Sequence, residues 1–284
     1  MLKPIRFDDL PRYSPWPKRL LGLVACTVRR KTEKEVIREF EHEKWGPLLK
    51  GLRAMRSPSP EKAMSLEADL AAREAFFESG RFAVASNREI QRRYLRLLAA
   101  ALRPFVKGAA GLVELGAGYG AQILSLSAHD DFKRLPLHAG EFTSSGQEAI
   151  RLIAAGLGEK IEVGYCDFRG LTSRGLDIPE NSVIFTSYSA HYVPVHSSGF
   201  VRFFRKWKPK AVVHFEPVYE HQGGASLHEL LCRRYIEVND YSRNLASVIE
   251  TACRKKEARL LKVEKNVFGS NPLLPFSIMA WAPR

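Results

Sequence analysis

Three glycines and one acid, close together near the middle of the chain, form the first candidate site. Residues 111–120 read GLVELGAGYG, so that a short apolar run leads through Glu114 to Gly116, Gly118 and Gly120. Glycines here permit a tight turn and let the main chain approach a ligand, as at the point where doubly wound sheets bind nucleotides. The letters GAGYGA also satisfy the dinucleotide pattern G-x-G-x-x-G/A. A glycine-rich turn that binds nothing is the alternative.

The acid at Glu114 favours one kind of nucleotide over another. A carboxylate at the end of the strand would repel a pyrophosphate, whereas it suits a cationic or amine-bearing ligand. The aminoacyl part and the sulfonium centre of S-adenosylmethionine have that character. The residues therefore favour a positively charged sulfur nucleotide over a dinucleotide.

The stretch VELGAGYG resembles motif I of the class I S-adenosylmethionine-dependent methyltransferases, and the likeness covers about residues 90–284. In that family an acid ending the second strand holds the ribose hydroxyls, and an acid and an apolar neighbour ending the third strand hold the adenine. The interval from the glycines to the second acid is longer here than usual in the family. The resemblance implies these cofactor-binding residues: Glu114, Gly116, Ala117, Gly118, Glu141, Asp167, Phe168 and Ser187. The alternatives are a solvated strand-end acid at Glu141 and a helix cap or turn residue at Asp167.

Two side chains after the fourth and fifth expected strands are candidate bases. The run SVIFTSYSAHYVP (182–194) resembles the family's fourth-strand motif that faces the methyl acceptor, and it contains His191. Histidine has an unperturbed pKa near 6.5, which suits removal of a proton from an acceptor oxygen. Glu216, at the end of the fifth strand, is the second candidate. A packed histidine and a strand-end acid bonded to backbone are the alternatives.

The acceptor is expected to contact Tyr192 and a polar, aromatic segment at 233–245, from which Asn239 and Tyr241 are selected. A solvent-facing amphipathic helix is an equally good interpretation of that segment. His191, His214, Glu216, Glu220 and His221 could surround a divalent cation, but they form no compact ligand motif, and magnesium prefers carboxylates and water. We expect no metal site.

Composition limits the class of protein. The chain has 284 residues, of which 45% are hydrophobic and 26% charged, as in ordinary globular proteins. Four cysteines without a C-x-x-C pair argue against disulfides and zinc, and the acids and prolines near the N-terminus argue against a signal peptide. No run is long enough to span a membrane. We therefore expect a soluble, cytoplasmic protein, and the sequence gives no oligomeric state.

Charge is unevenly distributed along the chain. The net charge is +13, and residues 1–107 hold 23 of the 44 bases but only 13 of the 31 acids. Such a segment could attract nucleic acid, anionic lipid or an acidic substrate. A solvated helical surface is the alternative.

The pattern of predicted secondary structure changes near residue 108. Before it, patterns at 31–49, 61–80 and 87–102 predict helices, with Thr32 and Asn87 as caps, Pro47 near one helix end and Gly80 ending another. After it, short apolar runs alternate with helical stretches, as in parallel sheets covered on both faces. Strands are expected at 111–115, 136–142, 160–167, 182–188, 210–218, 259–268 and 276–283, and helices at 119–128, 144–156, 197–207 and 226–256.

These patterns predict an α/β protein with a doubly wound, mostly parallel, seven-stranded Rossmann-like sheet. Its last strand is expected to be antiparallel, because only a loop joins the final two strands. Residues 1–90 are expected to form a mainly helical cap that covers the substrate, and residues 91–284 the S-adenosylmethionine-binding methyltransferase domain. The resemblance implies S-adenosylmethionine as cofactor and methylation of an oxygen or nitrogen atom of a small molecule, in the manner of bacterial proteins assigned as sugar or natural-product O-methyltransferases.

Three rival functions remain open at this stage. The basic N-terminal third suggests methylation of RNA or another polyanion, although no RNA-binding appendage and no Asn/Asp-Pro-Pro-Tyr type motif is present. The pattern GAGYGA suggests an NAD-dependent dehydrogenase, which Glu114 and the antiparallel final strand oppose. A nucleotide-binding module without catalytic activity is the third.

Overall fold

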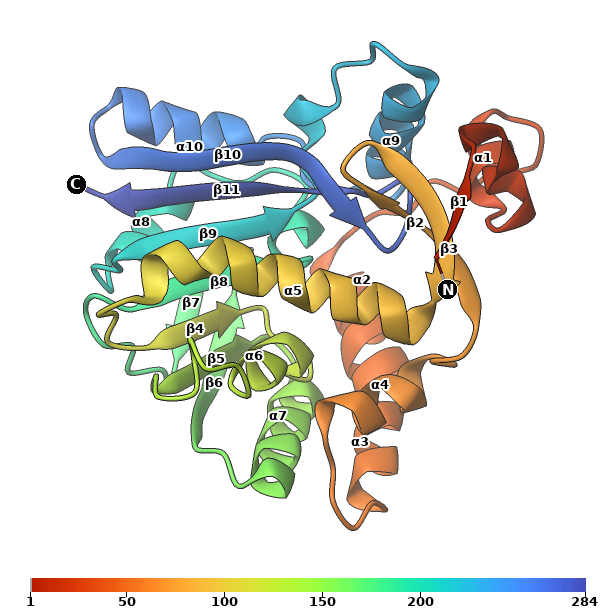
Figure 1. The fold of residues 1–284 in the computed structure, drawn as a ribbon. Coiled ribbons are helices and arrows are strands. Elements are labelled where there is room, and N and C mark those ends of the chain that lie inside the picture. The colour runs from red at the N-terminus through yellow and green to blue at the C-terminus, as the bar shows by residue number, and fades with distance from the viewer. Residues whose placement is uncertain (1) are drawn as a thin grey trace.

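A single mixed sheet runs through the computed structural model of the protein, which describes residues 2–284 (Figure 1). Its strand order is β1-β3-β2-β10-β11-β9-β8-β4-β5-β6-β7. The strands are β1 (Lys3–Ile5), β2 (Arg73–Glu78), β3 (Arg81–Ser86), β4 (Leu112–Leu115), β5 (Leu137–Glu141), β6 (Ile161–Asp167), β7 (Thr172–Arg174), β8 (Val183–Ser187), β9 (Ala211–Glu216), β10 (Ala258–Gly269) and β11 (Phe276–Pro283).

The centre of the sheet has the predicted arrangement. β6, β5, β4, β8 and β9 are parallel neighbours, and β11 pairs antiparallel with both β9 and β10. The prediction of seven strands was wrong, because the sheet has eleven. The short β7 extends one edge, and β1, β2 and β3 extend the other beyond β10.

The three added strands come from the segment expected to be helical. β2 and β3 form a hairpin whose two-residue turn, Ser79-Gly80, has positive φ at both positions (+47° and +82°). Turns of that kind match the twist of paired strands. The predicted helix at 61–80 therefore ends early, at Glu67, and Gly80 belongs to a hairpin turn. β2 also pairs with β10, so the N-terminal segment contributes directly to the sheet.

Helices cover both faces of the sheet, and in Figure 1 the long α5 crosses the face nearest the viewer. The α-helices are α1 (Trp16–Leu20), α2 (Glu33–Ile37), α3 (Gly46–Arg53), α4 (Pro60–Glu67), α5 (Asn87–Val106), α6 (Ala121–Leu126), α7 (Ser144–Leu157), α8 (Phe200–Arg205), α9 (Leu227–Val238) and α10 (Leu245–Arg254). Short 3₁₀ helices are η1 (Phe7–Arg12), η3 (Ala190–Tyr192) and η4 (Tyr219–His221), and η2 (Arg38–Trp45) is a π-helix.

Several helix boundaries in the structure differ from those predicted from the sequence. Thr32 is the N-cap of α2, as predicted, but Ser86 rather than Asn87 caps α5. The helical stretch that begins at α2 continues through η2 into α3, because Pro47 lies in the first turn of α3, where proline is tolerated. The helix predicted at 226–256 is two helices, separated at Asp240, whose φ is +53°.

The central strands are continuous apolar runs because the hydrophobic core covers both faces of the sheet. In β4, Leu112 belongs to the hydrophobic cluster on one face of the sheet, and Val113 and Leu115 belong to the cluster on the other. Successive strand residues point to opposite faces, so a strand covered on both faces is apolar at almost every position. Glu114 interrupts this run as a buried acid. The boundary proposed at residue 90 lies within α5, and the division into two domains stays a prediction.

Candidate active site

A cavity of about 370 Å³ opens at the carboxyl ends of β4, β5, β6 and β8. The chain runs from β4 toward β5 and β6 on one side and later adds β8 and β9 on the other, so the strand order reverses at β4. Open α/β sheets bind ligands at such a reversal. All eight residues predicted to bind the cofactor line this cavity: Glu114, Gly116, Ala117, Gly118, Glu141, Asp167, Phe168 and Ser187.

The glycine bend after β4 is required by close packing. Gly116 and Gly118 have φ values of +75° and +57°, which side chains with a Cβ adopt rarely. A Cβ on Gly116 would lie 2.4 Å from the Cβ of Ser189, and one on Gly118 would lie 3.1 Å from the ring of Trp45. Segments far apart in the sequence therefore press on both sides of the bend.

The N–H groups of the bend are already used within the protein. Those of Gly116 and Ala117 donate to the carbonyl of Gly140 (2.7 and 3.0 Å), and that of Gly118 donates to Glu141 Oε2 (2.8 Å). Pyrophosphate sites of the dinucleotide type depend on free N–H groups at such a turn and at the following helix N-terminus. This bend offers space for a ligand without offering those donors.

Glu114 has a buried carboxyl group, and no cation among residues 2–284 pairs with it. Its Oε2 accepts from the backbone N–H of Ile123 (3.0 Å) in the first turn of α6. Burial raises the pKa of Glu114 well above 4.5; the Ile123 hydrogen bond opposes that shift, and the nearby Glu141 adds to it. The charged form would be favoured by a cation placed in the cavity.

The acids after β5 and β6 are held by local backbone. Glu141 Oε1 accepts from the N–H and hydroxyl of Thr143 (3.0 and 2.7 Å), and burial raises its pKa despite these bonds. Asp167 closes a turn by accepting from the N–H groups of Arg169 and Gly170 (2.8 and 2.9 Å). Each carboxylate oxygen has two acceptor sites, so both acids retain capacity for a ligand.

The N-terminal helices supply cavity residues that sequence reasoning missed. Phe40 and Trp45 from η2 and Met64 and Glu67 from α4 line the cavity. Trp45 packs edge-on against Tyr119 of the bend at 5.1 Å between ring centroids, and Tyr119 donates its hydroxyl to Glu67 Oε2 (2.9 Å). A wide apolar stripe at 36–45 was visible, but nothing in its spacing indicated that it would face a ligand.

Polar contacts hold these helices over the sheet. Glu41 accepts from the hydroxyl of Ser144 (3.0 Å) and the N–H of Ser145 (3.2 Å), at the N-terminus of α7, where a negative charge is favourable. The buried Lys31 pairs with Glu39 Oε2 (2.5 Å), and its Nζ lies 4.9 Å from the ring centroid of Tyr192. The N-terminal helices therefore contact the rest of the protein at two separate places.

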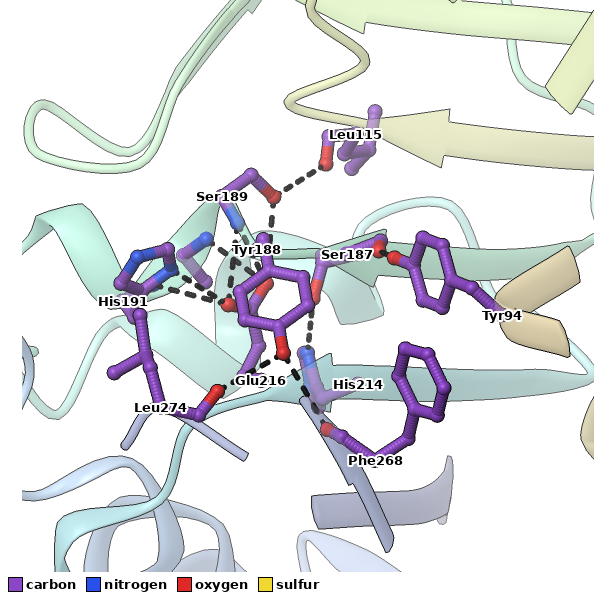
Figure 2. Close-up of polar contacts among 12 residues, drawn as sticks. Tyr94, Leu115, Ser187, Tyr188, Ser189, His191, His214, Glu216, Phe268 and Leu274 are labelled. Atoms are coloured by element: carbon purple, nitrogen blue, oxygen red, sulfur yellow. Dashed lines mark hydrogen bonds and ion pairs between the residues drawn. The ribbon is translucent and has the colours of Figure 1, made fainter. Parts of the chain in front are cut away.

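The two candidate bases, His191 and Glu216, do not line the cavity. Glu216 is fully buried, and its carboxylate accepts from the backbone N–H groups of Ser189, Ala190 and His191 and contacts His191 Nδ1 at 3.1 Å (Figure 2). Burial opposes ionisation, but these bonds outweigh it and lower the pKa of Glu216. The pair is placed to hold the loop after β8, beneath the cavity wall.

Only one of the three predicted acceptor contacts reaches the cavity. Tyr192 lines it, whereas Asn239 is buried and donates to the carbonyl of Tyr235 (2.9 Å). Tyr241 packs behind Tyr192, edge to face at 5.3 Å between centroids. The break between α9 and α10 turns these side chains inward, which a continuous helix would not do.

Two further tyrosines, Tyr94 from α5 and Tyr188 from the loop after β8, line the cavity. Tyr94 reaches from α5 to bond the hydroxyl of Ser187, and burial raises its pKa well above 10. Tyr188 has a φ of +47° and donates to the carbonyl of Leu274 (2.9 Å), as Figure 2 shows. Bulky residues with positive φ are uncommon and concentrate at functional sites.

The described residues, 2–284, contain neither a metal-binding cluster nor a membrane-spanning helix. No group of three His, Cys, Asp or Glu side chains there is arranged to hold a metal ion. His214, which the sequence suggested as a metal neighbour, instead accepts from Trp281 Nε1 (3.0 Å) and contacts Thr186 Oγ1 (2.9 Å). In the same range no helix has the length and apolar character needed to cross a membrane.

Comparison with known proteins identifies the fold. No protein-family model matches the sequence, and no curated protein matches it significantly. Magnesium protoporphyrin IX methyltransferase (ChlM) from Synechocystis PCC 6803, solved with bound SAH, is similar with a TM-score of 0.53 and 9% identity, over 89% of this chain and 100% of that one. This confirms the predicted α/β Rossmann-like architecture, which the resemblance to class I S-adenosylmethionine-dependent methyltransferases implied.

Two further solved structures are more distant. A mutant of MtNAS in complex with S-adenosylmethionine has a TM-score of 0.49 and 15% identity, over 88% of this chain and 77% of that one. The mitomycin 7-O-methyltransferase MmcR has a TM-score of 0.45 and 16% identity, over 86% and 68%.

Proposed function

We propose that this protein is an S-adenosylmethionine-dependent methyltransferase that transfers a methyl group to an oxygen or nitrogen atom of a small molecule. The observation that carries the proposal is Glu114, a buried carboxylate in the cavity wall that lacks a cation and stands beside a glycine bend. A ligand with a positive sulfonium and an α-ammonium group supplies the missing charge. The likeness of fold to a methyltransferase solved with SAH supports the same conclusion.

The residues of the cavity fit the parts of that cofactor. Glu114 and the bend at Gly116 would face the methionine portion, and Glu141 would accept from the two ribose hydroxyls. Asp167 and the ring of Phe168 would contact the adenine. All five lie at the ends of three neighbouring strands, β4, β5 and β6, so a single extended ligand could contact them all.

A dehydrogenase is a weaker candidate. An NAD pyrophosphate would meet the acids Glu114 and Glu141, and the N–H groups of Gly116 and Ala117 are directed to Gly140 instead of to the cavity. Repulsion between the carboxylates and a pyrophosphate disfavours NAD, and so does the lack of N–H donors directed to the cavity.

Catalysis in this site would rest on placement of the reacting atoms. When bound, the cofactor supplies an electrophilic methyl group, and the protein holds the acceptor in line with it; such orientation can contribute about 7–11 kcal/mol. The wall near the end of β8, formed by Ser187, Tyr188 and Ser189, would orient the acceptor. His191 and Glu216 would act as positioning residues, because they hold this loop from below.

Calorimetric titration with S-adenosylhomocysteine and with NAD in parallel tests the proposal. We expect one S-adenosylhomocysteine to bind per chain and NAD to give no heat above dilution. Binding of NAD, or no binding of S-adenosylhomocysteine at millimolar concentration, would overturn the proposal. A steep fall of acceptor binding with added salt would instead favour a polyanionic acceptor.

A further inference from the structure

The chemistry of the acceptor can be inferred from the aromatic and charged residues that line the cavity. We propose that the acceptor is an uncharged, planar aromatic amine that is methylated on nitrogen. This inference rests on the proposed function, because it takes the cofactor position as given. It departs from the sugar acceptor that the sequence suggested.

The shape of the wall favours a flat ring. Four aromatic side chains form a continuous row, in which Tyr119, Trp45, Phe40 and Tyr192 follow one another at 5.1, 5.7 and 4.9 Å between ring centroids. All four line the cavity. Aromatic faces and edges bind planar π-systems favourably and offer few hydrogen bonds to a polyol.

A second aromatic group lines the same cavity. Tyr94 stacks on Phe268 at 5.8 Å with 11° between ring planes, and Tyr188 lies 6.2 Å from Tyr94. The hydroxyls of Tyr94 and Tyr188 are bonded to Ser187 and to the carbonyl of Leu274. These tyrosines therefore present mainly ring surface, because their polar ends are already occupied.

The charge of the wall excludes an anionic acceptor. Although the chain carries a net charge of +13, the charged cavity residues are five acids and a single base. That base, Arg169, donates to the backbone carbonyl of Lys31. A phosphate or carboxylate in the cavity would meet five acids and one base, so the charge of the wall disfavours an anion. The acids are Glu33, Glu67, Glu114, Glu141 and Asp167.

The lack of a strong base in the wall favours nitrogen over oxygen. Among residues 2–284, no histidine and no lysine lines the cavity. An alcohol ionises only with a strong base, and a phenolate would be repelled by the five acids. A neutral amine attacks with its lone pair and needs no prior deprotonation.

Charge is conserved when nitrogen is the nucleophile. The nitrogen lone pair forms the new C–N bond while the C–S bond breaks, and its electron pair stays on sulfur to give S-adenosylhomocysteine. Positive charge thus moves from sulfur to nitrogen, and the arylammonium product then loses its proton to water. Carboxylates in the wall, such as Glu67, would stabilise the charge as it develops on nitrogen.

A matched set of small probes tests the inference in the presence of saturating S-adenosylhomocysteine. The probes are 1-aminonaphthalene, 1-naphthol, 1-naphthoate and methyl β-glucoside, and the readouts are calorimetry and quenching of tryptophan fluorescence. We expect the amine to bind at least about tenfold more tightly than the naphthoate and the glucoside. Unlike the naphthoate, it carries no negative charge for the acids to repel. Unlike the glucoside, it has an aromatic ring that can pack on the aromatic wall. With labelled S-adenosylmethionine, label should pass to the amine in preference to the naphthol.

Equal or tighter binding of the naphthoate or the glucoside would overturn the inference, as would the absence of any probe binding at millimolar concentration. Preferential methylation of the naphthol would overturn the choice of nitrogen. Because S-adenosylhomocysteine binding is measured in the same samples, failure of the proposed function is seen separately, as the absence of that binding.

Two variants and one matched control test which part of the wall binds the probes. Phe40→Leu should weaken binding of 1-aminonaphthalene by about three- to tenfold through loss of ring contact, while Phe82→Leu, at an equally half-buried ring outside the cavity, should leave it unchanged. Met64→Arg adds a cation to the wall and should raise the affinity for 1-naphthoate relative to 1-aminonaphthalene. Equal effects of Phe40→Leu and Phe82→Leu would contradict the proposed ring slot.

Discussion

The ends of β4 and β9 each bury a glutamate, and the two carboxylates differ in what surrounds them. Glu216 accepts from three backbone N–H groups and contacts His191, and its pKa is lowered. Glu114 accepts from a single N–H, and its pKa is raised well above 4.5. Burial is nearly the same for both. The number of donors, rather than burial, accounts for the opposite pKa shifts of the two carboxylates.

The largest expected effect is on the stability contributed by Glu216. Glu216→Ala leaves three buried N–H groups and His191 without their partner, so we expect the free energy of unfolding to fall by about 3–5 kcal/mol. Urea denaturation measures it. Glu264→Ala, at an exposed strand glutamate, is the matched control and should change stability by less than about 0.5 kcal/mol. A loss under about 1 kcal/mol for Glu216→Ala would remove the contrast with Glu114.

At Glu114 the effect should appear in binding instead. Glu114→Gln keeps an acceptor for the N–H of Ile123 but removes the charge, so S-adenosylmethionine should bind about 10- to 100-fold more weakly, as expected for a lost charge-assisted hydrogen bond. Stability near neutral pH should be unchanged or higher, because a buried charge without a cation is removed. Calorimetry and urea denaturation together check both parts. Unchanged affinity together with lower stability would make Glu114 a structural residue like Glu216.

A smaller effect is expected at His191. His191→Asn removes one of the contacts to Glu216, and we expect a loss of about 1–2 kcal/mol in stability. The turnover rate at saturating substrate should stay within about threefold of wild type, because the ring does not line the cavity. A fall of about a hundredfold or more in that rate, with S-adenosylhomocysteine binding intact, would restore His191 as a base.

The two glutamates should also respond to pH in opposite directions. The folded-state pKa of Glu114 is raised, so the native state binds the extra proton and stability declines as pH rises above about 4.5 through that raised pKa. The folded-state pKa of Glu216 is lowered, so its stabilisation is present above 4.5 and is lost as pH falls through the lowered pKa. Each contributes at most about 1.4 kcal/mol per pH unit. Urea denaturation over a pH series checks this: Glu114→Gln should flatten the decline at higher pH, and an unchanged decline would contradict the assignment.

The sequence predicted the strand-end residues that line the cavity better than the lining residues of the N-terminal helices, for a physical reason. Glu114, Glu141 and Asp167 stand at the ends of strands, and parallel strands bring their carboxyl ends to one edge whatever the loops do. The positions of Trp45 and Phe40 depend on how η2 packs over the sheet. That packing depends on the contacts of Glu41 and Lys31, which join residues more than a hundred positions apart in the sequence. Periodicity shows that a helix has an apolar face without showing what that face contacts.

The hairpin of β2 and β3 was missed for a related reason. The letters AAREAFFE contain good helix formers, and local propensity favoured a helix there. The pair Ser79-Gly80 lies between Phe76-Phe77 and Phe82-Ala83-Val84, with one charged residue on each side, and was a hairpin signal. Pairing of β2 with β10 decided the outcome, since sheet context overrides local propensity.

The most direct measurement of the central claim is the pH dependence of S-adenosylmethionine binding by wild type and Glu114→Gln, in a pH series that rises from about 4.5, because burial raises the pKa of Glu114 above that value. If Glu114 is the carboxylate that receives the cationic ligand, wild-type affinity rises with pH as that group ionises, and the variant shows weaker binding with a shallower slope. The same affinity and slope in both proteins would contradict it.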